Sequence, residues 1–535
     1  MDATIRRELL ARARFGRKEK VSGTEGVVVS SHPVVSRVGA DVLRGGGNAV
    51  DAVVAAAVAQ TVVEPHMTTI FGVYSMLHWE AATGETTYLN GSMNAPLEPL
   101  TLAPGDLAGG KGVAVPGFWA GVEASLERFG TKAKSELVAP AIALAREGFE
   151  VYPFLYAMLF GQANNLGRTE ETRELFLPGG GLIAPGELLV QHRLADTLEA
   201  LVERGNEHFY RSAFTQRVVD TVTEAGGVLT MEDFDRYHAR WVEPGWSTYR
   251  GHRFAVSPPP DTGGTHVAEI LNLVELVPLD EWGSWLESPD TLYWLLRFCG
   301  EVFADGARYG DPNSHPIPLD TILSKQYAQT RFELMQMGTT LDRAVPGAYP
   351  GSNHLTVVDR DGNVATVLHS VMSHAWTNGL YVDGVQIWAG GAHLLRKMPE
   401  PGDRGTCYVA PTILFGQDDR PLLAAGSPSV GLIQNLVQNT INIIDFGKDV
   451  EASVHEPRFG GQAIENFQLG GPPRYYCETD VPAELRAEVE RRGVRLHEVG
   501  PWNWHSGSYE GIHLLPDGRA EACADPRRAG QAEAA

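Results

Sequence analysis

A chain of 535 residues with 43% hydrophobic and 21% charged residues has the composition of a folded globular protein, long enough for two or three domains. Its formal net charge of −22 argues against nucleic acid and anionic membranes as partners. Because no run of about 18 apolar residues is present and residues 1–20 lack the apolar core of a secretory signal, we expect a cytoplasmic protein whose four scattered cysteines are reduced and bind no structural metal.

The first expected elements are a short strand and two helices. The strand is predicted at residues 27–30, and a helix at 32–44 ends at three consecutive glycines. Asn48 is predicted to cap a second helix, whose body at 52–63 is almost entirely Ala and Val. A helix that is apolar on all sides is buried, so we expect this one to lie under a sheet.

Strands and helices then alternate through the middle of the chain. The segment from residue 117 to about 235 is predicted to be mostly helical, with helical spacing at 137–148 and 194–204. The other predictions here are strands at 72–78, 86–89 and 249–256, a rigid turn at 257–264, helices at 266–277 and 301–308, and loops at 312–318 and 346–351.

Residues 350–362 read Pro-Gly-Ser-Asn-His-Leu-Thr-Val-Val-Asp-Arg-Asp-Gly, and they place a small nucleophile before a β-branched run. The run ends in an Asp-Gly hairpin signal, so strands are predicted at 355–358 and 364–370. Cutting the bond between Gly351 and Ser352 would give Ser352 an α-amine that can act as general base for its own hydroxyl. A Gly-Ser pair before a strand is more often only a turn, so this segment alone leaves both interpretations open.

The last third of the chain predicts a sheet followed by one long helix and a hairpin. Strand-like runs occupy 379–382, 412–415 and 422–425, a helix is predicted at 431–446, and two strands within 505–522 flank a Pro-Asp-Gly turn. Helices around a two-part sheet suggest stacked layers with the helices outside.

Ordered motifs along the chain resemble the γ-glutamyltransferase (γ-glutamyltranspeptidase) family. They include Val-Glu-Pro-His-Met at 63–67, Ser-Pro-Pro-Pro-Asp-Thr-Gly-Gly at 257–264, Gly-Ser-Pro at 426–428 and Ala-Asp-Pro-Arg-Arg-Ala-Gly at 524–530. The resemblance implies an α+β fold, the four-layer αββα sandwich of the N-terminal-nucleophile hydrolases. It also implies self-cleavage into a large-subunit region, 1–351, and a small-subunit region, 352–535, which stay together as a heterodimer in one intertwined unit.

The same resemblance assigns catalytic residues. The family's nucleophilic threonine falls on Ser352, and a threonine that hydrogen-bonds the nucleophile falls on Ser370. Two glycines that supply oxyanion N–H groups fall on Ser429 and Val430, and Val430 cannot easily adopt a positive φ. Either this loop has an ordinary conformation or the oxyanion hole is altered. Gly-Ser-Asn at 351–353 also resembles, over three residues, the cleavage point of serine-type β-lactam acylases.

The substrate positions depart from the family pattern. The arginine that grips the substrate carboxylate falls on Ser92, which cannot form a bidentate, charge-assisted pair. Other polar contacts of the amino-acid head group fall on Met372, Trp388 and Tyr408, which are apolar or aromatic. This set points to a less polar, non-glutamyl acyl group, although the tryptophans could equally serve packing.

Three functions therefore remain open. The first is a self-processing amidohydrolase or acylase that forms an acyl-enzyme on Ser352 with a small non-γ-glutamyl amide. The second is a true γ-glutamyl hydrolase or transferase that uses other contacts. The third is an uncleaved, inactive relative that acts as a binding protein. No cofactor or metal is expected, and neither nucleic acid nor membrane is an expected partner.

Overall fold

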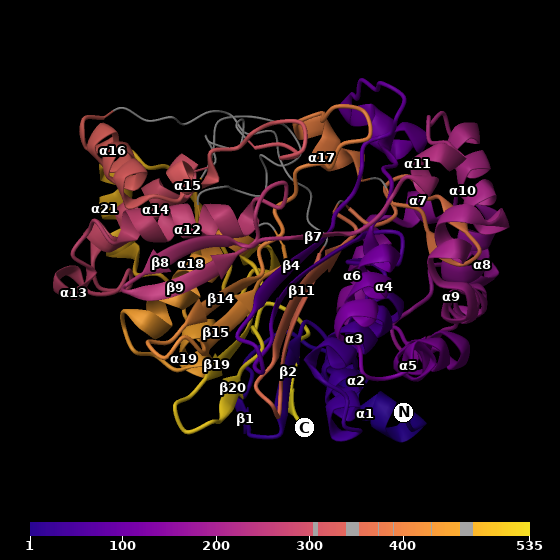
Figure 1. Ribbon diagram of the computed structural model, residues 1–535, viewed down its shortest axis with the longest axis horizontal. Coiled ribbons are helices and arrows are strands. Elements are labelled where there is room, and N and C mark those ends of the chain that lie inside the picture. Colours follow the sequence, from indigo (N-terminus) through magenta and orange to yellow (C-terminus); the bar gives the residue numbers. More distant parts are fainter. Residues whose placement is uncertain (303–308, 339–351, 373, 389, 430, 461–474) are drawn as a thin grey trace.

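Two seven-stranded antiparallel sheets lie face to face in the computed structural model (Figure 1), which describes residues 1–302, 309–338, 352–372, 374–388, 390–429, 431–460 and 475–535. Sheet I has the order β21 (Gln531–Ala534), β2 (Gly26–Ser30), β10 (Asn353–Asp359), β11 (Val364–Ser370), β3 (Val73–Trp79), β4 (Thr86–Gly91) and β7 (Arg240–Val242). Sheet II has the order β1 (Val21–Gly23), β20 (Ala520–Ala522), β19 (Glu510–Leu514), β15 (Pro421–Gly426), β14 (Thr412–Phe415), β9 (His252–Val256) and β8 (Gly245–Tyr249). Each sheet takes strands from both sides of residue 352, so the two predicted regions are interleaved.

Both faces of sheet I are buried, so every residue of its central strands β10, β11 and β3 is buried, the polar ones included. In β10, Leu355 and Val357 pack against helices, whereas Val358 faces sheet II. Successive side chains of a strand point to opposite faces, so one run of residues supplies both layers. Alanines and β-branched residues of the two sheets fill the space between them, together with Leu77, Trp79, Tyr88 and Phe415.

Helices from the first half of the chain cover the outer face of sheet I (right in Figure 1). The inner helices are α2 (Pro33–Arg44), α3 (Ala49–Val63) and α4 (Phe118–Phe129); α1 (Ala3–Arg12), α5 (Lys134–Glu147), α9 (His192–Arg211), α10 (Ala213–Glu224) and α11 (Met231–Asp235) lie around them. Every residue of α3 is buried because it lies between β10 and β11 on one side and α2, α4 and α5 on the others. Asn48 and Asp51 form the capping box at its start.

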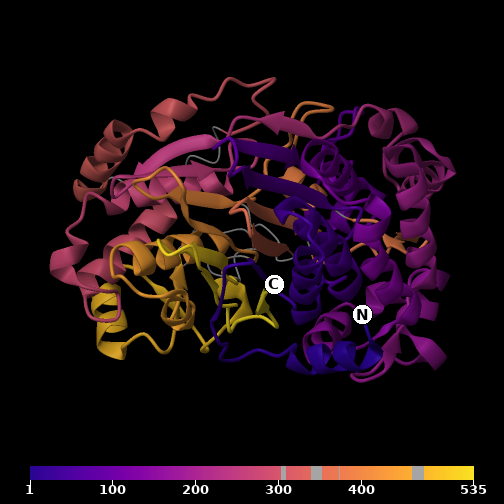
Figure 2. The same cartoon turned by 60° about the horizontal axis from the view of Figure 1, so that its bottom comes forward.

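A second group of helices covers the outer face of sheet II, and Figure 2 shows both sheets between the two groups. It consists of α12 (Gly263–Val274), α14 (Pro289–Glu301), α16 (Lys325–Gln336), α18 (Leu432–Ile444), α19 (Val450–His455) and α21 (Ala483–Arg491). The architecture is therefore mixed α/β, with helices outside two central sheets.

Shorter elements complete the described chain. The strands are β5 (Phe149–Glu150) with β6 (Leu188–Leu189), β12 (Tyr381–Val382) with β13 (Val385–Gln386), and β16 (Phe459–Gly460), β17 (Tyr475–Glu478) and β18 (Leu496–Val499). The helices are α6 (Pro153–Gly161), α7 (Ala163–Leu166), α8 (Glu170–Phe176), α13 (Leu279–Trp282), α15 (Leu319–Ile322) and α17 (Gly391–Arg396), and short 3-10 turns include Trp504–Ser506.

Most predicted elements are confirmed within a few residues, but two need correction. The predicted strand at 249–256 is the end of one strand and the whole of the next, because Arg250 and Gly251 both have positive φ and form the turn between β8 and β9. Glu301, where a helix was expected to start, is the last residue of α14. Residues 303–308 of that predicted helix and the expected loop at 346–351 lie outside the described residues.

Two further expectations from the sequence concern the cysteines and membrane-spanning segments. All four cysteines are buried, and no disulfide bond joins any two of them. None of the described helices is long and apolar enough to cross a membrane. The cytoplasmic location stays a prediction.

Candidate active site

The hydroxyl of Ser352 lies where loops from the ends of both sheets meet. Ser352 directly precedes β10, and the pairing of Asn353 with His369 places it beside the end of β11. In sheet II, β15 ends at Gly426, and the loop that follows brings the backbone N–H of Ser429 to 2.9 Å from the Ser352 Oγ. Ser352 is only 7% exposed. A buried hydroxyl therefore faces a backbone hydrogen-bond donor.

The donor loop has an unusual backbone conformation at Ser429. Its φ of +80° lies in the left-handed region, which glycine normally occupies. The Ser429 hydroxyl donates to the carbonyl of Trp504 over 3.1 Å, a contact that helps to hold this conformation. The backbone of Ser429 is thus left-handed, whereas the choice between an ordinary loop and an altered oxyanion hole, which depends on Val430, stays open. Val430 and Gly351 lie outside the described residues.

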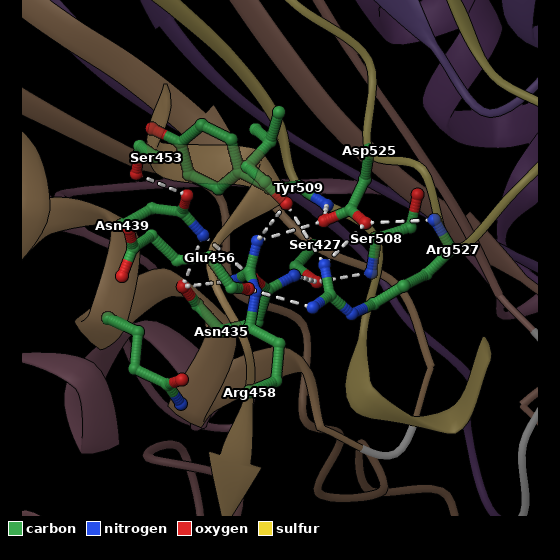
Figure 3. A network of polar contacts seen from close by, with 12 residues as sticks. Ser427, Asn435, Asn439, Ser453, Glu456, Arg458, Ser508, Tyr509, Asp525 and Arg527 are labelled. Atoms are coloured by element: carbon green, nitrogen blue, oxygen red, sulfur yellow. Dashed lines mark hydrogen bonds and ion pairs between the residues drawn. The ribbon is translucent and has the colours of Figure 1, made fainter. Parts of the chain in front are cut away.

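A hydrogen-bond network behind the donor loop fixes its position (Figure 3). Along α18 and α19, Ser453 donates to Asn439, Asn439 to Asn435, and Asn435 to the Ser427 hydroxyl, over 2.6, 2.7 and 2.8 Å. The N–H of Ser508 donates to the same hydroxyl over 3.2 Å. Buried and fully connected polar groups of this kind restrict a loop to one conformation.

The same network continues into the Asp-Pro-Arg-Arg motif. Asp525 accepts from Arg458 over 3.1 Å and from the N–H of Tyr509 over 3.0 Å, and it pairs with Arg527 at 3.2 Å. Both arginines and Asp525 are almost fully buried. The C-terminal motif thus contacts the elements that support the donor loop.

His354 lies between the sheets, directly under the donor loop. Its Nε2 is hydrogen-bonded to Thr366 at 2.8 Å and Thr356 at 3.2 Å. A Cβ atom on Gly426 would lie 1.9 Å from the His354 Cε1, so the ring occupies the space beside that glycine. Burial holds the pKa of His354 well below its ordinary value. The ring therefore stays neutral and packs the space between the sheets.

Ser370 and Met372 lie at the end of β11, next to the nucleophile strand. The N–H of Met372 donates to the Ser370 hydroxyl over 2.6 Å, and Met372 has a positive φ of 50°. A Cβ on Gly72 would lie 2.2 Å from the carbonyl oxygen of Ser370, so this corner is tightly packed. The hydrogen bond from Ser370 to Ser352 that the resemblance implies stays a prediction.

Ser92 directly follows β4 at the same end of sheet I, but its hydroxyl faces Asp261. The distance is 2.5 Å, and Asp261 also accepts from Ser75, Tyr88 and Asn90 at 2.7 Å each. Because Asp261 follows β9 of sheet II, this fully buried carboxylate joins the ends of the two sheets. The hydroxyl at position 92 is thus used internally, a contact that sequence reasoning missed.

The remaining predicted substrate residues separate into two groups. Met372 and Trp388 belong to the apolar cluster on sheet I, and the Trp388 ring packs directly against Gly390. Tyr408 belongs to the cluster on sheet II, with its ring 5.7 Å from His266. All three are at least nine-tenths buried.

A buried charged group that sequence reasoning did not single out lies beside Ser352. Arg528 donates through Nη1 to the carbonyl of Ser352 at 3.3 Å and to the Oδ1 of Asn353 at 3.4 Å. Burial raises the pKa of Glu64 to about 7 and that of Glu510 well above its ordinary value, and the charge of Arg528 opposes both shifts. Glu64 and Arg528 lie in motifs that resemble the family, at 63–67 and 524–530, and Glu510 lies in β19. Only folding brings the three residues together.

Replacing Glu64 by glutamine is expected to flatten the pH dependence of stability. Its folded pKa of about 7 exceeds the ordinary 4.5, so between these values the unfolded chain loses a proton that the folded chain keeps. Stability therefore falls as pH rises through this window, by about 2–3 kcal/mol for a fully buried group. The comparison uses the uncut S352A chain as the parent. The Tm of S352A/E64Q minus the Tm of S352A should be more positive at pH 8 than at pH 5.

The apparent Tm of the two chains at pH 5 and pH 8 checks this expectation. E203Q, which changes an exposed glutamate on α9, serves as the control. An equal Tm difference between E64Q and its parent at both pH values would show that Glu64 is ionised throughout.

Sequence comparisons agree with this geometry. The profile of the family described as Gamma-glutamyltranspeptidase matches residues 35–535. The chain is 29% identical to the Glutathione hydrolase proenzyme of Bacillus subtilis (strain 168), covering 95% of this chain and 91% of that protein. It is 30% identical to the Acylase ACY 1 proenzyme of Pseudomonas sp. (strain SE83), covering 94% and 92%.

A solved structure extends the likeness to the whole fold. The crystal structure of cephalosporin acylase from Bacillus halodurans superposes with a TM-score of 0.85 and 26% identity, covering 97% of each chain. Among the described residues, no cluster of three or more His, Cys, Asp or Glu side chains could hold a metal ion. The chain belongs to the gamma-glutamyltranspeptidase family and is an amide hydrolase or acyltransferase of the N-terminal-nucleophile type.

Proposed function

We propose that this protein cleaves its own chain between Gly351 and Ser352 and then hydrolyses a small, non-γ-glutamyl amide through an acyl-enzyme on Ser352. The observation that carries the proposal is the buried Ser352 hydroxyl 2.9 Å from the backbone N–H of Ser429. The fold is then the four-layer αββα sandwich of this superfamily. Residues 1–351 and 352–535 form a heterodimer, which the interleaved sheets would hold together.

The cleavage step is an intramolecular acyl shift. The Ser352 Oγ attacks the Gly351 carbonyl carbon, the Gly351–Ser352 C–N bond breaks, and the proton of the hydroxyl passes to the nitrogen. Water then hydrolyses the ester, which leaves a carboxylate on Gly351 and restores the hydroxyl. The product carries a free α-amine on Ser352.

Turnover repeats the chemistry on an external amide. The α-amine takes the hydroxyl proton as the Oγ attacks the substrate carbonyl, and the protonated amine then gives a proton to the departing amine. Water or a second amine attacks the acyl-enzyme and releases the acyl group. Backbone N–H groups of the loop at Ser429 are suited to stabilise the oxyanion.

The proposed substrate class rests on the side chains at the four positions that correspond to substrate contacts in the family. The Ser92 hydroxyl is committed to Asp261 and has no positive charge for a carboxylate. Met372, Trp388 and Tyr408 are buried apolar or aromatic side chains that bring no charged partner for an amino-acid head group. These side chains favour a neutral, apolar acyl group over a zwitterionic γ-glutamyl group. Glutathione hydrolase and acylase names both occur among the relatives, so a γ-glutamyl substrate is the alternative.

A matched pair of anilides tests the substrate class. We expect kcat/KM for a neutral five-carbon acyl anilide to exceed that for γ-glutamyl anilide by roughly tenfold to a hundredfold, because a charged head group would be buried without partners. γ-Glutamyl anilide with its α-carboxylate amidated is the control, and it should be hydrolysed faster than the free acid. Faster turnover of the γ-glutamyl substrate supports the second function, and an uncut chain inactive on all three supports the third.

A further inference from the structure

Arg528 is a fully buried cation whose hydrogen bonds go to the nucleophile residue and its neighbour. Its Nη1 contacts the Ser352 carbonyl and the Asn353 Oδ1, whereas its Nε and Nη2 have no hydrogen-bond partner among the described residues. No ion pair joins it to a carboxylate within the part of the chain that the structure describes. The rings of Phe154 and Trp504 lie 5.9 and 5.8 Å from its guanidinium carbon.

The preceding residue shows what a structural arginine looks like in this fold. Arg527 is equally buried but pairs with Glu478 at 2.6 Å and Asp525 at 3.2 Å, and it also donates to backbone carbonyls. Burying a charge without such partners is costly. Its ion pairs therefore account for the burial of Arg527, whereas Arg528 has no such partners in the described ranges that would account for its burial.

Below about pH 7, where Glu64 favours its neutral form, the charges around Arg528 leave its positive charge largely uncompensated near Ser352. The titratable groups that face it from the surrounding elements are Glu64, His66, Tyr152, His505, Glu510 and Asp525, with His32 and Lys18 behind them. Burial raises the pKa of Glu510 and Glu64, which favours their neutral forms, and lowers the pKa of the three histidines. Asp525 already pairs with Arg458 and Arg527.

We propose that Arg528 is a positioning residue for the reaction: it fixes the Ser352 backbone through the carbonyl and keeps the neighbouring α-amine in its neutral, basic form. The inference rests on the proposed function, in which that amine is the general base. The amine and the carbonyl belong to one residue, so the amine lies within roughly 7 Å of the guanidinium. A nearby positive charge disfavours the protonated amine, whose ordinary pKa of about 7.7–8.0 would otherwise leave it mostly charged at neutral pH.

The test compares R528Q and R528K with the mature wild-type enzyme over pH 5 to 9. In R528Q the acidic limb of the kcat/KM profile should move to higher pH by about half a unit to one unit, and kcat/KM at pH 7 should fall by about twofold to tenfold, since more of the amine is protonated. R528K keeps the charge, so its limb should stay with that of the wild type. R519Q, which changes an exposed residue of the β19–β20 hairpin, is the control.

Superimposed profiles for R528Q and the wild type would overturn the inference. Where R528Q does not yield folded, cleaved protein, R528M, which fills similar space without a charge, takes its place: an upward shift of its acidic limb supports the inference and an unshifted limb contradicts it. Sequencing the new N-terminus of the wild-type small subunit separates this result from a failure of the proposed function. A chain that is not cut at Ser352 refutes both, whereas a correctly cut enzyme with an unshifted R528Q profile refutes only the role of Arg528.

Discussion

Replacing Ser352 by alanine should abolish both chain cleavage and amide hydrolysis. The methyl group offers no lone pair for attack on the Gly351 carbonyl, so the chain should run as one band on a denaturing gel. Without its nucleophile the residual kcat should fall by at least about 10⁴-fold. S352T keeps a hydroxyl at the same position and should still be cut.

A denaturing gel measures chain cleavage and an anilide assay measures amide hydrolysis, both on the same protein preparations. S135A removes an exposed hydroxyl on α5 and should leave both readouts at wild-type level. An S352A chain that still matures and turns over would mean that another residue is the nucleophile. A wild-type chain that stays whole after long incubation would favour the uncleaved relative.

Replacing Gly426 by alanine should disrupt the donor loop from within the protein. The added Cβ would lie 1.9 Å from the His354 ring, which Thr356 and Thr366 hold in place. Such overlap in a packed interior costs about 1–3 kcal/mol or more. Since the loop at Ser429 follows directly, a displacement of about 1 Å would also lower kcat by roughly 10²-fold.

A double substitution distinguishes this clash from a general intolerance of alanine. H354A empties the space that the new methyl group needs, so H354A/G426A should be more stable and more active than the two single effects predict. G500A, which adds a Cβ in open space, is the control. Additive losses in the double variant, measured as Tm and kcat, would show that the His354 ring is not what excludes a side chain at position 426.

Local sequence patterns were sufficient to predict an element wherever one short segment determines its structure. The β-branched run after Ser352 and its Asp-Gly turn gave β10 and β11 within a residue or two, and Asn48 caps α3 as expected. The Ala- and Val-rich body of α3 predicted complete burial correctly. The turn at Arg250–Gly251 was missed, because only Gly251 carries a turn signal there while its neighbour adopts positive φ without one.

The sequence by itself therefore determined the family, the nucleophile candidate, the strand that presents it and the loss of the arginine at position 92, because each is written in a contiguous motif. Tertiary structure alone decided what surrounds the nucleophile. Glu64 is hundreds of residues from Glu510 and Arg528 in the sequence, and Glu510 lies on β19 of sheet II whereas Arg528 precedes β21 of sheet I. Their charges interact only because loops at the ends of both sheets meet beside Ser352. The left-handed backbone of Ser429 and the pairing of Ser92 with Asp261 have the same origin, since packing between the sheets outweighs local preference there.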